Sequence, residues 1–213
     1  MIKRKFRAVS LTRLALGLAI LCAAASATAQ VDKAATDDAA RKIASTVCAS
    51  CHGPAGVGTS PVFPRLAGQT EMYLAAQLRA FKNKTRGEQD AHDYMWGMAT
   101  LLEDPMIDGL ARYYSAQKPG PGIAGDAKLI ARGKTLFEKG DPAQEIMACS
   151  QCHGPRAEGN TIFPRLAGQR AAYVVRQIDA IQKRSRESPV MHGVIKEMDA
   201  ETMRSVAEYV QSL

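Results

Sequence analysis

The chain has 213 residues, of which 46% are hydrophobic and 23% are charged, and its formal net charge is +7. Such a composition is typical of a globular protein, and the length allows one or two small domains. Five of the 28 basic residues precede residue 14, and none of the 21 acidic residues precedes residue 30, so the rest of the chain has 23 basic and 21 acidic residues. No basic block remains that could follow a phosphate backbone, which argues against a nucleic-acid partner.

Residues 1–29 have the pattern of a signal peptide. A basic stretch over 1–13 is followed by an apolar run over 14–25, and Ala27-Thr28-Ala29 fits a cleavage site with small residues. The run is short for a membrane span, although an uncleaved anchor is the alternative. We therefore expect export to the periplasm and a mature chain that begins after residue 29.

The most informative pattern is a pentapeptide that occurs twice. A helix expected over 39–51 leads into Cys-Ala-Ser-Cys-His at 48–52, and a helix expected over 127–139 precedes Cys-Ser-Gln-Cys-His at 149–153. Two cysteines separated by two residues can bond covalently to a haem, and the following histidine can ligate its iron. The sequence therefore predicts two covalent haem c groups, attached through Cys48, Cys51, Cys149 and Cys152, with His52 and His153 as iron ligands.

Two other kinds of site use closely spaced cysteines. A Cys₄ zinc site would need both pairs to meet in space and needs no histidine after each pair. A thioredoxin-like dithiol would need a βαβ context, and no strand pattern surrounds either copy. A disulfide framework is also unexpected, because the fifth cysteine, Cys22, belongs to the predicted signal peptide.

The pentapeptides belong to a longer internal repeat. Phe63–Gln69 recurs letter for letter as Phe163–Gln169, and the Pro/Gly-rich segment 118–124 lies between the copies. We therefore expect two domains, over 30–117 and 125–213. Each is short for a stable apolar core, and a haem would supply much of what is missing.

Helices dominate the expected structure of each domain. The residues around Tyr73 and those around Tyr173 place apolar side chains at the same helical spacing. A last helix in each domain is expected to begin at an N-cap, which is Asp104 before Pro105 in the first domain and Asp199 in the second. The sequence thus predicts an all-α fold: two tandem class I cytochrome c domains, each wrapped round one haem.

The repeat also selects a second axial ligand for each iron. Each half offers four methionines, but only Met95 and Met191 coincide when the halves are aligned, each within a Met-x-Gly loop. A thioether is a soft ligand that favours ferrous iron and raises the potential. The alternative is that both methionines only fill the core. His92 and His192 are rival ligands, but neither has a counterpart in the other half, and we expect both on the surface.

Two further pairs of residues repeat near the expected haems. The carbonyls of Pro64 and Pro164 could accept a hydrogen bond from Nδ1 of the iron-ligating histidine, or each proline could simply shape a loop. Arg65 and Arg165 could face haem propionates, although an exposed arginine is the commoner case.

With these motifs in place, the sequence resembles the cytochrome c4 family of periplasmic dihaem cytochromes. The resemblance rests on the paired C-x-x-C-H-G, on F-P-R-L-A-G-Q followed by a tyrosine, and on M-x-G, and it covers nearly all of the expected mature chain. It implies two similar domains related by a pseudo-twofold axis, with the haem propionate edges facing across the domain interface.

The resemblance further implies an electron carrier rather than an enzyme. The implied partners are transient redox proteins: a cytochrome bc1-type donor or a dehydrogenase, and a membrane haem–copper oxidase as acceptor, with any membrane association made through them. One alternative is a cytochrome subunit fixed in a dehydrogenase complex. Another is a dihaem peroxidase, which would need an open coordination site, and the shared Met95 and Met191 argue against it.

Overall fold

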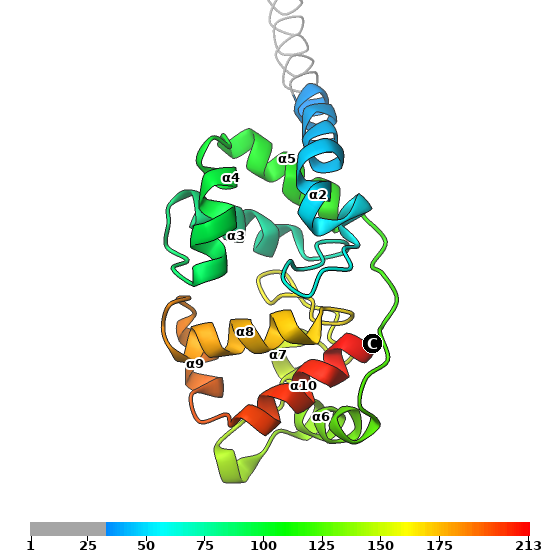
Figure 1. Ribbon diagram of the computed structural model, residues 1–213, viewed down its shortest axis with the longest axis vertical. Helices are drawn as coiled ribbons and strands as arrows, with labels where there is room; N and C mark the ends of the chain where they lie inside the picture. The colour runs from blue at the N-terminus through cyan, green and yellow to red at the C-terminus, as the bar shows by residue number, and fades with distance from the viewer. Residues whose placement is uncertain (1–32) are drawn as a thin grey trace, which may run out of the picture.

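The computed structural model describes residues 33–213, so the predicted signal peptide lies outside the described residues. Within that range every regular element is a helix, and the only β contacts are three isolated bridges. The helices form two bodies, half one (residues 33–117) and half two (residues 125–213), which stack along the long axis of the molecule (Figure 1). An extended segment joins them along one side. This is the predicted all-α arrangement of two tandem domains.

Half one is built from a long first helix and several shorter ones. Residues 33–43 are α-helical and continue without a break into a π-helical turn, η1 (Ala44–Cys48), and then α2 (Ala49–His52). The remaining elements are η2 (Pro54–Gly56), α3 (Glu71–Lys82), η3 (Ala91–Met95), α4 (Trp96–Thr100) and α5 (Asp104–Ser115). The long first helix, α3 and α5 meet in a core formed by Ala40, Ala44, Leu74, Ala75, Ile107, Leu110, Ala111 and Tyr114.

Half two repeats this plan. Its elements are α6 (Ala127–Lys139), η4 (Pro142–Gln144), α7 (Ser150–His153), α8 (Ala171–Gln182), α9 (Pro189–Ile195) and α10 (Ala200–Ser212). Helices α6 and α10 cross closely, because Gly133 lies against the backbone of Ser205 with no room for a Cβ atom. The core of this half includes Leu136, Phe137, Val174, Ile178, Ile195, Val206 and Val210.

The two final helices begin differently. Asp199 caps α10 by accepting a hydrogen bond from the Thr202 amide, as predicted. In half one, α5 already includes Asp104, and Glu103 occupies the N-cap position, so the predicted cap is wrong by one residue. The carboxylate of Asp104 instead accepts a hydrogen bond from Arg79 of α3 at 3.3 Å, which ties these two helices together.

A reciprocal pair of glutamines joins the two halves. The Gln169 side chain accepts a hydrogen bond from the Arg65 amide at 2.9 Å and donates one to the Arg65 carbonyl at 3.1 Å. Gln69 makes the same two bonds with Arg165, at 2.7 and 2.9 Å. Both glutamines are buried. Because each half presents the same residues to its copy, this contact gives a physical reason for the unchanged repeat of Phe63–Gln69.

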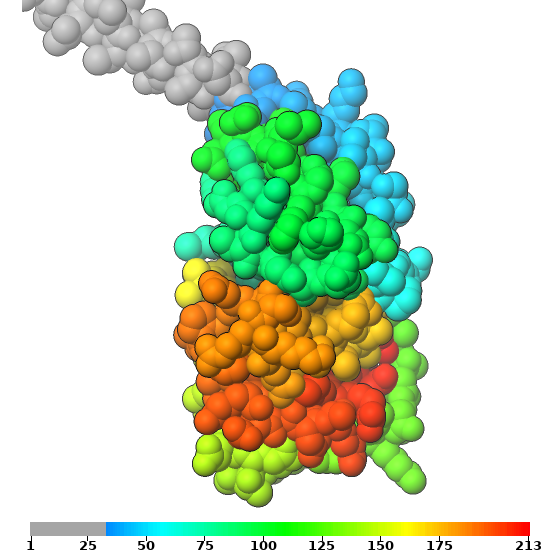
Figure 2. Space-filling view, turned by 60° about the vertical axis from the view of Figure 1, so that its left-hand side comes forward, coloured from blue at the N-terminus to red at the C-terminus, as the bar shows by residue number. Residues whose placement is uncertain are grey.

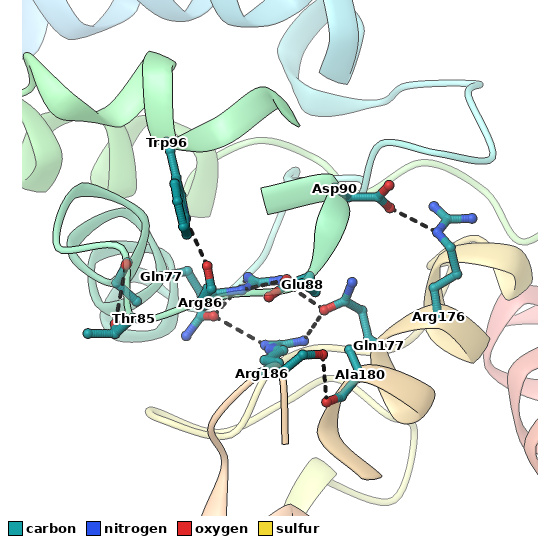
Figure 3. A network of polar contacts seen from close by, with 12 residues as sticks. Gln77, Thr85, Arg86, Glu88, Asp90, Trp96, Arg176, Gln177, Ala180 and Arg186 are labelled. Atoms are coloured by element: carbon teal, nitrogen blue, oxygen red, sulfur yellow. Dashed lines mark hydrogen bonds and ion pairs between the residues drawn. The ribbon is translucent and has the colours of Figure 1, made fainter. Parts of the chain in front are cut away.

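A buried polar network also crosses between the halves (Figure 3). Arg86 donates to the side-chain oxygen of Gln77 in its own half at 3.0 Å and to that of Gln177 in the other half at 2.8 Å. Arg186 donates to the same two oxygens, at 3.2 and 2.6 Å. Glu88 forms an ion pair with Arg86. Around this network the side chains of α8 and α9 lie directly against half one, as Figure 2 shows for one face of the molecule.

Candidate functional site

The first pentapeptide lies at the C-terminal end of the long helix of half one. Cys48 ends the π-helical turn and is partly buried, whereas Cys51 in α2 is exposed. His52 closes α2 and is 7% exposed. Gly53 then takes a φ of 78° and a ψ of 165°, a conformation that essentially only glycine adopts, and the helix ends there. The histidine is thereby placed where the chain leaves the helix.

A proline carbonyl fixes the Nδ1 atom of each motif histidine. Nδ1 of His52 lies 2.9 Å from the carbonyl oxygen of Pro64, and Nδ1 of His153 lies 2.8 Å from that of Pro164. The prolines therefore have the hydrogen-bonding role. Burial lowers the pKa of both histidines more than the carbonyl contact raises it, so each ring is neutral at pH 7. Because a carbonyl only accepts, Nδ1 carries the proton and Nε2 keeps the lone pair that a metal ligand needs.

The second pentapeptide places its histidine in a closed site. His153 is 4% exposed, and its Nε2 atom is buried without a hydrogen-bond partner. Before haem attachment, burial raises the pKa of the Cys149 thiol to about 11, and none of the four motif cysteines forms a disulfide. A buried ring nitrogen without a partner is costly unless it coordinates something. A covalently attached haem fits this donor set, since its edge bonds to two thiols and its iron takes one imidazole from the same short segment.

Met95 and Met191 occupy matching places in the two halves. Met95 ends η3 just before α4, Met191 lies in α9, and both are partly buried. The predicted Met-x-Gly loops are wrong, because both segments are helical. The space beside Gly97 and beside Gly193 is open, since a Cβ atom added to either glycine would meet no atom within 4 Å. Both glycines are exposed, so this open space faces solvent.

The other described methionines lie at the surface or in the cores, and Met191 also packs against the core of half two. Met72, Met98 and Met147 are about half exposed. Met198 is buried in the core of half two, while Met106 and Met203 pack against the cores of their own halves. These positions match ordinary surface and core roles.

The two rival histidines have different environments. His92 is exposed and lies 3.0 Å from the neighbouring aspartate, as expected of a surface residue. His192 is partly buried, and its Nδ1 lies 3.0 Å from the Ile181 carbonyl, so the surface assignment is wrong for this residue. The residue aligned with it in half one, Trp96, donates from Nε1 to the Arg86 carbonyl at 2.8 Å. The aligned rings therefore anchor α4 and α9 to the backbone, a role that sequence reasoning missed because it considered His192 only as a ligand.

Arginines gather between the two halves. Arg65 and Arg165 line one small cavity there, and Arg65 donates to carbonyls of its own loop, the linker and half two. Arg165 and Arg170 each have a buried Nε atom without a partner. Burial lowers the pKa of Arg65 and Arg165, but a guanidinium remains charged at any physiological pH. Buried cationic donors without an acceptor fit the carboxylates of haem propionates.

The alternatives to haem attachment lack a geometric basis. Within residues 33–213, no group of three or more His, Cys, Asp or Glu side chains is placed to hold a metal ion, as a Cys₄ zinc site would require. The same residues contain no βαβ unit of the kind that carries a thioredoxin-like dithiol.

In the described part of the chain, no helix is both long enough and apolar enough to cross a membrane.

Each helical half carries Cys-x-x-Cys-His, and in each the neutral histidine is oriented by a proline carbonyl. This arrangement defines a tandem c-type cytochrome. The cytochrome c family matches residues 38–113 and again residues 130–213, and the chain belongs to this family. It carries two covalently bound haem c groups, one in each half. Within the family it is a dihaem cytochrome of the c4 type, as its relatives show.

Three relatives show this most directly. Cytochrome c-552 of Acidithiobacillus ferridurans is 39% identical over 92% of this chain and 85% of its own length. Cytochrome c4 of Azotobacter vinelandii is 36% identical, over 84% of this chain and 90% of its own. The solved structure of Acidithiobacillus ferrooxidans cytochrome c4 is 38% identical, covers 78% of this chain and 98% of that one, and superposes with a TM-score of 0.74.

One further relative is named for its partner. A thiosulfate dehydrogenase electron acceptor from Thiomonas intermedia is 39% identical over 76% of each chain. The predicted family, fold class and cofactors are confirmed by these comparisons, and the chain is an electron carrier of the cytochrome c4 kind.

Proposed function

We propose that each half holds its haem iron between a histidine and a methionine, and that the protein carries electrons in the periplasm. The iron ligands are His52 with Met95 and His153 with Met191, and the haem-attaching thiols are Cys48, Cys51, Cys149 and Cys152. The observation that supports this most strongly is the buried, partnerless Nε2 of His153, on a ring whose other nitrogen is already fixed by Pro164.

The bound haem supplies a one-electron iron couple, and the residues of the chain set its properties. The carbonyls of Pro64 and Pro164 hold a proton on Nδ1 of the histidines, which makes Nε2 a better donor. The thioethers of Met95 and Met191 favour the reduced state and close the second face of each iron. With both faces closed, the protein passes electrons without making or breaking a substrate bond.

The acceptor is a membrane haem–copper oxidase, and the donor is a cytochrome bc1-type complex or a dehydrogenase. The resemblance to cytochromes c4 supports this placement. Contacts of this kind are small and short-lived.

A second candidate function is that of a cytochrome subunit in a dehydrogenase complex, favoured by the relative named as a thiosulfate dehydrogenase electron acceptor. The two candidates differ in the lifetime of the contact. Gel filtration of a lysate under mild conditions separates them: a free carrier elutes alone, whereas a subunit co-elutes with its catalytic partner.

The experiment that tests the site itself is carbon monoxide binding to the purified, reduced protein. Two covalent haems per chain that both resist carbon monoxide are expected, because each iron has six ligands. One haem that binds carbon monoxide readily would contradict the proposal for that half and would revive the peroxidase hypothesis.

A further inference from the structure

The loop that leads to the histidine-binding proline is closed locally in half two. Asn160 and Phe163 exchange both of their backbone hydrogen bonds, at 2.9 and 2.8 Å, and form an isolated β-bridge. This bridge lies immediately before Pro164, whose carbonyl holds Nδ1 of His153. The loop that orients His153 is therefore closed by backbone hydrogen bonds within half two.

The corresponding loop of half one is longer. Twelve positions separate His52 from Pro64, whereas eleven separate the matching pair in half two. The longer loop contains Pro61, which has no N–H group to donate. Among the described residues, no backbone bridge closes this loop, and Val62 and Phe63 donate only to the hydroxyl of Ser60, at 3.1 and 3.5 Å.

Half two supplies the missing contacts through Arg176 of α8. Its Nη2 atom donates to the carbonyls of Pro61 at 3.1 Å and Val62 at 2.7 Å. Its Nε atom donates to Asp90 of half one at 3.0 Å, and Figure 3 shows this reach from α8 across to the other half. Ala76 occupies the matching position on α3, so half one has no matching arginine, and it contacts the corresponding loop through the Thr70 hydroxyl, which donates to the Thr161 carbonyl.

The contact acts directly beside His52. Val62 precedes Phe63, whose ring packs edge-on against the His52 ring with centroids 6.1 Å apart. The next residue is Pro64, which accepts the Nδ1 hydrogen bond. A displacement of this loop therefore moves both the ring packed on the histidine and the carbonyl that orients it.

We propose that Arg176 is a positioning residue for the haem of half one. Half two supplies side-chain contacts that hold the loop orienting His52, whereas the corresponding loop of half two is closed mainly by its own backbone bridge. This inference rests on the proposed ligation by His52. Loss of Arg176 weakens the hydrogen bond at Nδ1, so Nε2 becomes a poorer donor to ferric iron and the potential of the half-one haem rises.

Arg176→Ala in the full haem-loaded chain tests this. The amides of residues 62, 63, 65 and 66 should exchange hydrogen about twofold to tenfold faster for each hydrogen bond lost, and those of residues 162, 163, 165 and 166 should not change. The potential of the half-one haem should rise while that of half two stays constant. Arg176→Lys should show most of the effect, because an ammonium group cannot serve three acceptors in a fixed fork. Lys183→Ala is the matched control, since this exposed residue of half two pairs only with Asp179.

The shorter loop of half two offers a variant that should restore the wild-type behaviour. Replacing residues 59–62 with Asn-Thr-Ile, the sequence of the shorter loop, should restore slow exchange and the original potential in the Arg176→Ala background. Equal shifts in both haems, no shift in either, or a grafted loop that restores nothing would overturn the role of Arg176. Intact His/Met spectra in all variants would leave the proposed ligation standing, so the two ideas fail separately.

Discussion

Truncation of Gln169 to alanine should destabilise the contact between the halves strongly. The side chain makes two hydrogen bonds to Arg65 across the interface, at 2.9 and 3.1 Å, and accepts a third from the Arg170 amide at 3.2 Å. It is 7% exposed, so its loss leaves backbone groups of Arg65 poorly satisfied. With about 1 kcal/mol for each bond and about 1–3 kcal/mol for an unsatisfied buried group, we expect a loss of about 2–4 kcal/mol.

The assay is thermal unfolding followed by circular dichroism, with chemical denaturation for the free energy. For a chain of this size 1 kcal/mol corresponds to about 2–4 °C, so Tm should fall by about 5–15 °C. Gln69→Ala should cost a similar amount, because its contacts with Arg165 have the same geometry. Gln89→Ala is the control: this exposed side chain bonds only to Asp93, and its loss should change stability by less than about 0.5 kcal/mol. Equal stability of Gln169→Ala and the control would refute this account of the repeat.

Two further predictions concern charged groups. Glu88→Gln should cost about 3–5 kcal/mol of unfolding free energy, because it removes the carboxylate that pairs with buried Arg86 beside buried Arg186. Glu187→Gln, at an exposed position, is the control. Equal losses for both variants would contradict the role of the network. The Arg112 guanidinium lowers the pKa of Asp37 by hydrogen bonding, so the pair stabilises the fold fully above about pH 4 and loses this contribution as the pH falls through the lowered pKa. Because the pair is partly exposed to solvent, Asp37→Asn should cost only up to about 1 kcal/mol of unfolding free energy at neutral pH. The variant should also lose less stability than the parent protein as the pH falls below about 4. An unchanged loss of stability in acid would show that the pair is not involved.

The sequence was sufficient for the fold because the repeat and the haem motifs are local patterns. Helix α6 begins and ends where predicted, at residues 127 and 139. The cap of α5 was missed because Arg79, which is distant in sequence, engages Asp104. The helical Met-x-Gly segment of half one was missed because Met95 ends a π-helical turn, which has no simple apolar period.

The interface was the part that sequence reasoning missed. Gln69 and Gln169 were recognised only as repeated letters, because their partners lie about one hundred positions away. Arg86 and Arg186 also coincide at an offset of 100, so a comparison of the halves could have found them. Arg176 has no counterpart in half one, and only the geometry shows what it holds.

The central claim is that the protein holds two closed haems, with one His/Met ligand pair in each half. The most direct test is to measure the absorption band that ferric iron shows when a thioether sulfur is bound. We predict that Met95→Ala removes about half of this band, that Met191→Ala removes the other half, and that the double variant removes it entirely while both haems stay covalently attached. Met98→Ala, an exposed neighbour, should leave the band unchanged. A band that survives in both single variants would contradict the ligand assignment, and with it the account of this protein as a carrier with two six-coordinate irons.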